Sequence, residues 1–302
     1  MQGLTRAARR ITIDMIVLLL CSAVANATNA QVRWVSNTSL GQSYFLIAHQ
    51  DDWQLFMGDV VVKTLKSGSP ATFIYLTAGD DGRDSSYWWT RERAALASTR
   101  VAAELLTAMA DSISCEPVTI GTHVIRKCTV GKTNSFFLRL PDGRRNGTGF
   151  VRYDNQSLRR LRSKRINSIT AVDGSTTYQS WDDLVKTVSS LIDTTSVDQV
   201  LVHTMDPSIA VNPHDHFDHR MAGLLVADLR KQRALDTRYY VGYALSTHAA
   251  NRSNSQAQQK TTVFLAYDQE MMRSNKDWRA YREHPAFYSD CMLRTYARSP
   301  RP

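Results

Sequence analysis

The stretch Phe45-Leu46-Ile47-Ala48-His49-Gln50-Asp51-Asp52 is an apolar run that ends abruptly in a histidine and two adjacent carboxylates. A short apolar run bounded by polar residues is typical of a buried strand in a parallel sheet. In open α/β sheets, ligands bind just beyond the carboxyl ends of such strands. We therefore expect His49, Asp51 and Asp52 to lie at a strand exit, where imidazole and carboxylate are suitable ligands for Zn²⁺.

A second segment, residues 212–220, is dense in histidine and reads NPHDHFDHR. A helix that begins at Pro213 or shortly after it places His216 and His219, three residues apart, on one face. Taken alone, this spacing is equally compatible with exposed histidines near a helix start. Because both segments follow apolar, strand-like runs, together they predict that the remaining metal ligand comes from here.

These two segments resemble the LmbE-like de-N-acetylases, the PIG-L family that includes N-acetylglucosaminylphosphatidylinositol deacetylase, over most of the chain. Segments that are similar to the secreted bacterial branch of this family are residues 75–80, 87–92, 137–143 and 212–216. The family usually has proline where this chain has Gln50 and an acidic residue where it has Trp53. Neither position is a metal ligand in the family pattern, so the departures concern substrate contact and loop rigidity.

The resemblance implies that His49, Asp52 and His219 bind zinc and that Asp51 is the general base. Chemistry agrees with these roles, because bound zinc lowers the pKa of water from 15.7 to about 7. Asp51 then takes a proton and later returns one to the leaving amine. Another divalent metal is an alternative, since metal loading follows availability as well as ligand type.

The resemblance also implies that His216 stabilises the oxyanion. A protonated His216, oriented by Asp218, is the expected donor, and such donors contribute about 3–4 kcal/mol. The expected activity is removal of the N-acetyl group from an N-acetylglucosamine-containing sugar, glycan or glycoconjugate. The alternatives are an inactive glycan-binding module of the same fold and a metal-dependent esterase or amidohydrolase acting on another substrate.

Candidate substrate contacts lie after the second apolar run. Asp80 belongs to the turn Gly79-Asp80-Asp81-Gly82, and Tyr87, Trp88 and Arg91 follow it. Aromatic side chains here either stack on a sugar ring or pack as a lid or core. Arg91 either contacts a substrate hydroxyl or phosphate or forms a surface ion pair.

Short apolar segments alternate with helical patterns along the chain. Strands are expected at residues 72–77, 135–140, 197–203 and 239–245, and helices at 91–109 with Thr90 as N-cap, at 180–192 with Ser180 as N-cap, and at 268–275, with a loop at 251–260. This alternation predicts a Rossmann-like three-layer α/β sandwich with a mostly parallel sheet.

The first 30 residues differ from the rest. Three arginines precede an apolar run at 15–20, and small residues suitable for cleavage follow near Ala27 or Ala30. This pattern predicts a signal peptide, and the apolar run is short of the roughly 20 residues that an uncleaved membrane anchor requires. We expect residues 31–302 to form one catalytic domain that is secreted into the periplasm or the extracellular space.

Export makes the cysteines informative, because disulfides persist in oxidising compartments. Cys115 and Cys128 flank a compact β-rich stretch, so we expect them to pair and leave Cys291 free. The bond would stabilise the fold by roughly 3 kcal/mol in the chain-entropy model. The alternative is that all three are buried thiols.

The formal net charge of +9 favours anionic surroundings such as the cell envelope. Residues 159–165 are the densest basic run, and they either contact an anionic glycan or membrane surface or form a solvated helix face. No segment resembles a nucleic-acid-binding motif, so nucleic acid is not an expected partner. Membrane contact is expected only through the signal peptide or a peripheral basic surface.

Overall fold

The computed structural model describes residues 42–105, 112–196, 199–275, 278 and 280–300. These residues belong to one compact unit, Val35–Pro302. The predicted signal peptide and its cleavage site lie outside the described residues. Among the described helices, none is long and apolar enough to cross a membrane.

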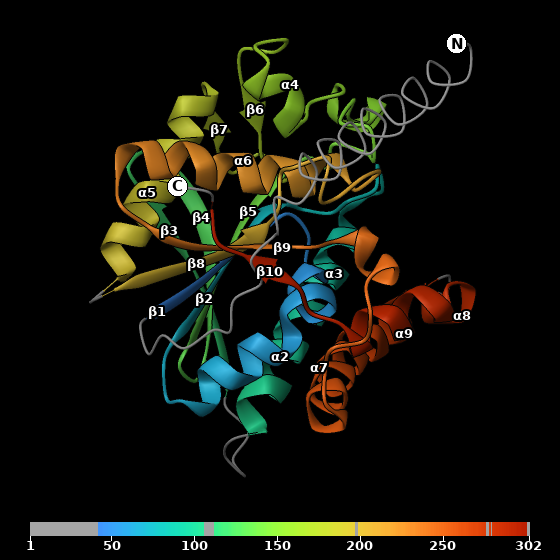
Figure 1. Ribbon diagram of the computed structural model, residues 1–302. Helices are drawn as coiled ribbons and strands as arrows, with labels where there is room; N and C mark the ends of the chain where they lie inside the picture. The colour runs from blue at the N-terminus through green and yellow to red at the C-terminus, as the bar shows by residue number, and fades with distance from the viewer. Residues whose placement is uncertain (1–41, 106–111, 197–198, 276–277, 279, 301–302) are drawn as a thin grey trace, which may run out of the picture. The chain divides into compact units, whose positions relative to one another are not determined.

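An eight-stranded sheet forms the centre of the described part of the chain (Figure 1). Its order is β10-β9-β8-β1-β2-β5-β4-β3. Five adjacent strands run parallel: β9 (Asp236–Tyr240), β8 (Val200–Met205), β1 (Gln42–Ile47), β2 (Ala71–Thr77) and β5 (Thr133–Leu140). The antiparallel strands β10 (Ala297–Arg298), β4 (His123–Val130) and β3 (Ile113–Ile120) lie toward the edges, and β6 (Ile169–Thr170) pairs separately with β7 (Thr177–Tyr178).

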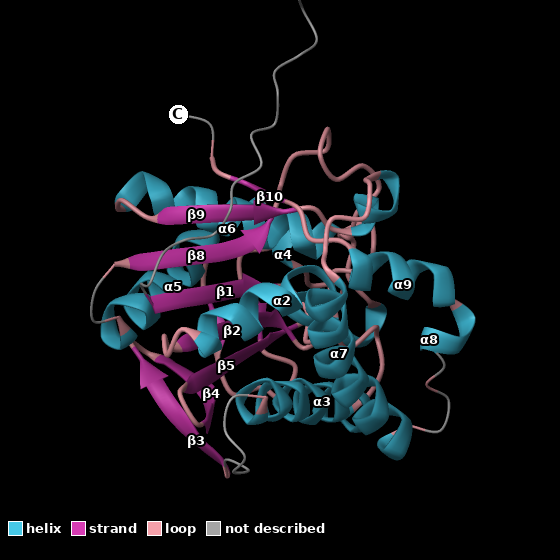
Figure 2. Ribbon diagram, turned by 60° about the horizontal axis from the view of Figure 1, so that its bottom comes forward, coloured by secondary structure: helices cyan, strands magenta, loops and turns pink. Residues whose placement is uncertain are grey.

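Helices cover both faces of this sheet (Figures 1 and 2). One face carries α2 (Asp52–Lys66), α3 (Ser85–Glu104), α7 (Asn254–Ser274) and α9 (Pro285–Leu293), with α8 (Ala280–Glu283) before α9, and the other carries α4 (Leu158–Arg162), α5 (Trp181–Thr195) and α6 (Phe217–Gln232). Two 3-10 turns, Val151–Tyr153 and Tyr243–Thr247, complete the described elements. The predicted α/β sandwich with a mostly parallel sheet is confirmed.

The apolar run that opens the described part of the chain is buried on both sides. All six residues of β1 are buried. Phe45 and Ile47 belong to the hydrophobic cluster on the α2 side, whereas Tyr44 and Leu46 belong to the cluster on the α5 and α6 side. A strand covered on both faces needs apolar residues at every position rather than at alternate ones, which explains the continuous run.

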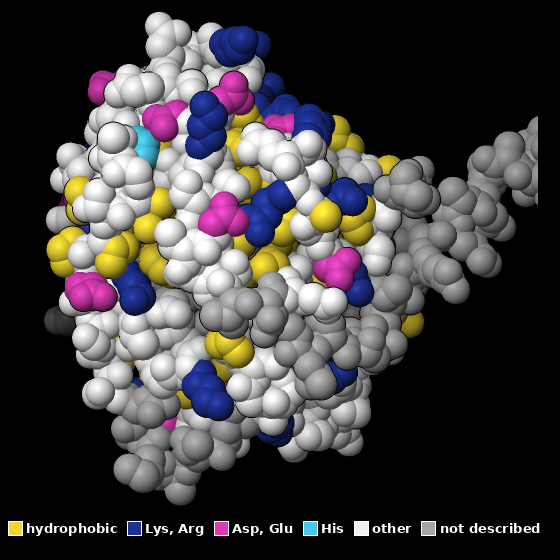
Figure 3. Space-filling model, turned by 90° about the vertical axis from the view of Figure 1, so that its left-hand side faces the viewer, with side chains coloured by type: hydrophobic (Ala, Val, Ile, Leu, Met, Phe, Trp, Pro, Cys, Tyr) yellow, Lys and Arg dark blue, Asp and Glu magenta, His cyan; other side chains and the backbone are white. Residues whose placement is uncertain are grey.

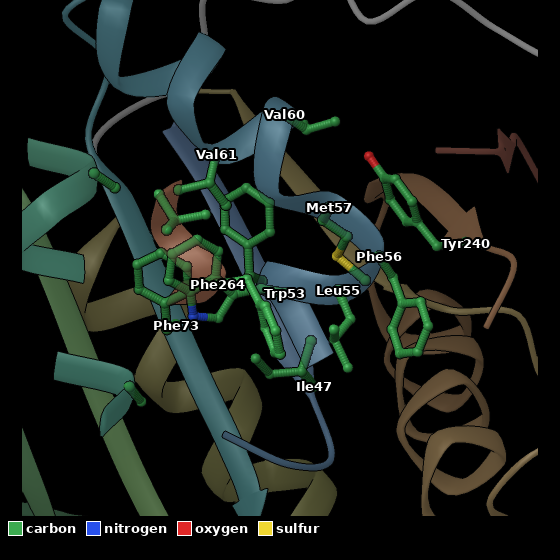
Figure 4. Packing of buried hydrophobic residues seen from close by; sticks show 14 of the residues in the cluster. Ile47, Trp53, Leu55, Phe56, Met57, Val60, Val61, Phe73, Tyr240 and Phe264 are labelled. Atoms are coloured by element: carbon green, nitrogen blue, oxygen red, sulfur yellow. The ribbon is translucent and has the colours of Figure 1, made fainter. Parts of the chain in front are cut away.

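Trp53 occupies the core between α2 and the sheet (Figure 4). Its side chain is fully buried, packs against the ring of Phe73, and donates from Nε1 to the hydroxyl of Tyr75 at 3.0 Å. The departure from an acidic residue at this position therefore changes the core.

The connections around β1 create a switch point in the strand order of the sheet. From β1 the chain passes to β2 on one side, and β8 later pairs with β1 on the other side. Ligands bind at such switch points, outside the carboxyl ends of the strands. The turn after β1 and the helix after β8 both lie at this point.

Three local expectations need correction, beginning with the helix predicted at 91–109. It begins at Ser85, because Asp84 is its N-cap and accepts from the backbone of Ser86 at 3.0 Å. Thr90 is inside the helix and donates to the carbonyl of Ser86 at 2.7 Å. The aromatic residues 87–89 therefore form its first turns rather than a loop before it.

The second correction concerns residues 251–260, predicted as a loop. Helix α7 begins at Asn254 behind a capping box, in which Ser253 and Gln256 satisfy each other's backbone amides. Such a box satisfies orphan amide donors of a helix start, so a polar sequence forms a stable first turn. Third, the strand predicted at 239–245 ends at Tyr240 and continues as a 3-10 turn.

Cys115 and Cys128 are joined by a disulfide across directly paired positions of β3 and β4. Cys291 is a free, buried thiol. The bond ties the edge strand β3, whose residues are largely exposed, to the rest of the sheet.

Arginine side chains of the basic run at residues 159–165 contact neighbouring parts of the protein. Arg159 donates to the carbonyl of Asn146 at 2.6 Å, and Arg162 forms an ion pair with Asp228 at 3.3 Å. On the face shown in Figure 3, basic side chains are interspersed with acidic ones. These contacts favour the solvated helix face for this run.

Candidate active site

Three donor atoms from the two predicted segments converge. Asp52 Oδ1 lies 3.0 Å from His219 Nε2 and 3.5 Å from His49 Nδ1, and the two imidazole nitrogens are 3.2 Å apart. Ligands about 2.0–2.1 Å from a tetrahedral zinc are about 3.3 Å from one another. The donor set and its spacing therefore fit a zinc-like divalent ion. We call these three residues the metal group.

Asp52 and His219 are each held by a contact outside the metal group. Asp52 Oδ2 accepts from the backbone of Ala48 at 3.0 Å and of His49 at 2.8 Å. His219 Nδ1 bonds Asp215 Oδ1 at 2.9 Å, which fixes Nε2 toward the group. Metal-binding histidines are commonly oriented by such a carboxylate. Sequence reasoning missed Asp215, although its position four residues before His219 is a signal.

Without a metal, the metal group holds protons. Burial opposes the charged forms of both histidines, but the nearby carboxylates, Asp52 foremost, together outweigh it, so the pKa of His49 is raised to about 10 and that of His219 well above its ordinary value. Burial likewise opposes ionisation of Asp52, and the two histidines nevertheless lower its pKa. A metal ion must therefore displace protons from these rings.

Asp51, the expected base, lies beside the metal group and is paired with Arg91. The Arg91 side chain is buried, donates to Asp51 Oδ1 from Nη2, to the carbonyl of Gly79 at 2.9 Å, and to the hydroxyl of Tyr267 at 2.9 Å. The Asp51 side chain remains 18% exposed. Arg91 thus forms a partly buried ion pair that orients the base, and its three donor groups all have partners in the protein.

His216 is the N-cap of α6 and differs from its expected form. Its Nδ1 accepts from the backbone amide of Asp218 at 3.2 Å, so the ring proton lies on Nε2. Burial first, and then the charges of His49 and His219, lower the pKa of His216. The structure therefore contains a neutral His216, oriented by the amide of Asp218, where a protonated ring oriented by its carboxylate was expected.

The carboxylate of Asp218 faces the opposite side of His49. Its Oδ2 accepts from the backbone of Gly143 at 2.7 Å and lies 3.6 Å from His49 Nε2. A Cβ at position 143 would overlap this carboxylate, so only glycine fits. The turn after β5 is therefore part of the site.

Asp142 is a further site residue that sequence reasoning treated only as part of a turn. Its carboxylate lies 3.6 Å from His49 Nε2 and 3.7 Å from His216 Nε2. Its backbone amide donates to Asp80 Oδ2 at 2.7 Å. Because its partners are distant in sequence, spacing gives no signal for it.

The remaining predicted substrate contacts support the walls of the site. Asp80 is fully buried, accepts from the backbones of Asp142 and Gly82, and has its pKa raised by burial to about 6. Tyr87 and Trp88 are buried, with Trp88 stacked on Trp89. For these aromatic residues, the geometry favours packing over a free sugar-binding face.

Gln50 also belongs to the walls. It is buried, and its side-chain amide donates to the carbonyl of Thr77 at 2.9 Å. The bond joins the turn after β1 to the end of β2. The amide thus gives the turn a fixed anchor where the family usually has proline.

Two hollows border the site and share His214 and Asp215. One, of about 180 Å³, is lined by residues that include His216, Phe217 and Arg220. The other, of about 530 Å³, is lined by Arg144, Arg145 and Asn146 besides the shared pair.

The chain is similar to several solved structures at low sequence identity. No curated protein matches the chain. Similar solved structures include a conserved protein from Thermus thermophilus, with 15% identity, 87% of this chain and 95% of that chain covered, and a TM-score of 0.44. Another is a triple mutant of a deacetylase in the teicoplanin biosynthetic pathway, with 11% identity, 86% of this chain and 97% of that chain covered, and a TM-score of 0.49. A third is N,N'-diacetylchitobiose deacetylase from Pyrococcus horikoshii, with 17% identity, 86% of this chain and 83% of that chain covered, and a TM-score of 0.41. At these values the similarities carry no argument about function.

A match to a protein-family model shows the family of the chain. The model of PIG-L, described as GlcNAc-PI de-N-acetylase, matches residues 44–229, which is more than half of the chain. The matched region runs from β1 into α6 and contains the metal group, Asp51, Asp142 and His216. The chain therefore belongs to the PIG-L family of GlcNAc-PI de-N-acetylases and is a metal-dependent N-deacetylase, a hydrolase of amide bonds.

Proposed function

We propose that this protein removes the acetyl group from an N-acetylglucosamine unit of a sugar, glycan or glycoconjugate, with zinc held by His49, Asp52 and His219. The observation that carries the proposal is the metal group itself, whose donor atoms lie 3.0–3.5 Å apart beside a partly exposed carboxylate. When bound there, a divalent ion supplies Lewis-acid polarisation and lowers the pKa of water from 15.7 to about 7.

Asp51 performs the proton transfers in this proposal. Arg91 holds one carboxylate oxygen, which leaves the other to take a proton from the attacking water. The same carboxyl then returns a proton to the leaving nitrogen. General acid–base catalysis of this kind contributes about 10²–10⁴-fold.

His216 stabilises the carbonyl oxygen as it becomes negative. The amide of Asp218 occupies Nδ1, so the hydrogen on Nε2 is available for donation. A neutral donor serves this purpose, because the low dielectric of a buried site strengthens its hydrogen bond to a charged oxygen. His216 therefore does not need to be protonated.

The sugar substrate is supported by the family, whose description names an N-acetylglucosamine compound. Export to the periplasm or the extracellular space is supported by the apolar segment with preceding arginines near the N-terminus and by the Cys115–Cys128 bond. The net charge of +9 suits an anionic cell envelope.

The test is a mass-spectrometric screen of the full-length, zinc-loaded protein against N-acetylglucosamine, its oligomers and envelope glycans. The expected result is loss of one acetyl group, with Asp51→Asn as the matched control that retains zinc and has a turnover reduced by about 10²–10⁴-fold. Acetate release only from O-acetylated sugars or only from N-acetyl amino acids would replace the proposal by an esterase or another amidohydrolase. Binding of glycans without any release would indicate a binding module.

A further inference from the structure

The imidazole of His49 lies between two groups of metal-binding side chains. Its Nδ1 belongs to the metal group, whereas Nε2 points to the other side, 3.6 Å from Asp142 and 3.6 Å from Asp218. His49 is only 5% exposed, and its Nε2 has no hydrogen-bond partner. An orphaned buried nitrogen that faces two carboxylates indicates a missing ligand.

The second group consists of His49 Nε2, Asp142, His216 and Asp218, whose donor atoms all lie within 4.8 Å of one another. Asp218 is fully buried, and its Oδ1 also lacks a partner. The group thus offers two orphaned atoms as well as the donor types that divalent cations bind.

The carboxylates of this group are held in place by hydrogen bonds from backbone amides. Asp218 Oδ2 accepts from Gly143 at 2.7 Å, and Asp142 Oδ1 accepts from the backbone of Arg144 at 2.7 Å. The amide of Asp142 is bonded to Asp80. The group is therefore arranged before any ligand arrives, which lowers the cost of binding.

The geometry points to a second divalent cation site formed by His49 Nε2, Asp142 and Asp218 beside the ring of His216, and this site competes with the metal group for His49. The inference rests on the proposed function, in which the metal group holds the catalytic zinc. Mixed nitrogen and oxygen donors suit Zn²⁺, Mn²⁺ or Co²⁺. His49 Nε2 lies 3.6 Å from each carboxylate, which is wider than the 3.0–3.5 Å separations of the metal group, so the second site is the weaker one.

Competition follows from the chemistry of imidazole. A neutral ring has one proton and one lone pair, so a ring that binds an ion through Nδ1 carries its proton on Nε2, and the reverse also holds. Each ion therefore lowers the affinity for the other by the same factor. An ion at the second site must displace the proton from Nε2, so zinc in excess fills this site only after the metal group and then places a cation beside His216.

The amount of bound zinc, measured in suitable variants, tests for this competition. Stripped full-length protein is dialysed against increasing Zn²⁺, and bound metal is measured by mass spectrometry. His219→Ala breaks the metal group but frees His49 for the second site, so this variant should still bind one zinc, more weakly than the wild type. Adding Asp142→Asn should lower this residual affinity by more than about tenfold.

The matched control adds Asp173→Asn instead, at a carboxylate that bonds Arg139 outside both groups. It should leave the residual affinity of His219→Ala unchanged. If His219→Ala binds no zinc, or if Asp142→Asn does not weaken its binding, the second site does not exist.

Crystals of the wild type in excess zinc give an answer that does not depend on any variant. An anomalous peak between His49 Nε2 and Asp142 supports the inference, and a single peak on the Nδ1 side at saturating zinc overturns it. Failure of the proposed function would give a different result, namely no acetyl release although one zinc is bound in the metal group.

Discussion

The two halves of the active site are built differently. In the turn after β1, Asp52 accepts from the amides of Ala48 and His49, so its contacts lie within five residues of chain. At the start of α6, Asp218 bonds Gly143, and the amide of Phe217 donates to the carbonyl of Arg145 at 3.2 Å. One half is determined locally, whereas the other depends on a loop about 75 residues away in the chain.

This difference predicts how substitutions act. A change in the turn after β1 affects ligands and base directly, while a change at Gly143 in the loop after β5 reaches the site through its contact with Asp218 of α6. Substitutions in the two halves should therefore differ in how strongly they lower metal content and turnover.

Asp52→Ala should have the largest effect. It removes a ligand and also leaves two buried amides of the turn without an acceptor. Metal content at one equivalent of zinc should fall to near zero, and turnover should drop by about 10⁴-fold or more, since the Lewis acid is lost. Metal analysis and acetate release measure both. Retention of both zinc and turnover at this concentration would show that the turn is not part of the metal site.

Asp51→Asn should keep the metal and reduce turnover by about 10²–10⁴-fold, because an amide cannot accept the proton of water. Arg91 keeps an oxygen acceptor at this position, so the local structure should be preserved. If Asp51→Asn strips the metal while Asp52→Asn retains it, the roles of the two carboxylates are reversed.

Gly143→Ala tests the half that depends on tertiary contacts. The added Cβ overlaps Asp218, so the α6 side must shift, and we expect a loss of about 10–100-fold in metal affinity or activity. The control is Gly121→Ala in the turn between β3 and β4, where a Cβ meets nothing within 4 Å. Its positive φ lowers stability slightly but should leave metal content and turnover unchanged. Equal effects of the two variants would show that the contact of Gly143 with Asp218 has no role in the site.

The same division explains what the sequence predicts. The turn after β1, its buried strand and the Ser180 cap of α5 are local, and each was predicted correctly. The partnership of Arg91 with Asp51 and the place of Asp142 were missed, because their partners meet only after the sheet has formed. The N-cap of α3 was misplaced because aromatic residues 87–89 were treated as a loop, although in the helix they pack against neighbouring elements.

The smallest effect should be a pH-dependent difference in stability between metal-free and zinc-loaded protein. In the metal-free fold the pKa of His49 is raised from 6.5 to about 10, because the nearby carboxylates outweigh its burial. The folded chain then binds this proton more tightly than the unfolded chain. The resulting stabilisation is fully present below pH 6.5 and is lost as the pH rises to about 10.

In the zinc-loaded protein the ion takes the place of that proton, so this loss should be absent at saturating zinc. We therefore expect the melting temperature of the metal-free form to fall relative to the loaded form between pH 7 and about 9.5. Groups outside the site, such as Lys260, whose pKa burial lowers to about 8, titrate in both forms and cancel in the difference. Metal-free His49→Gln lacks the titrating ring and should show less decline over this range. Parallel melting profiles for the stripped and loaded wild type would mean that His49 does not exchange a proton for the metal, and the local half of the site would then need another ligand.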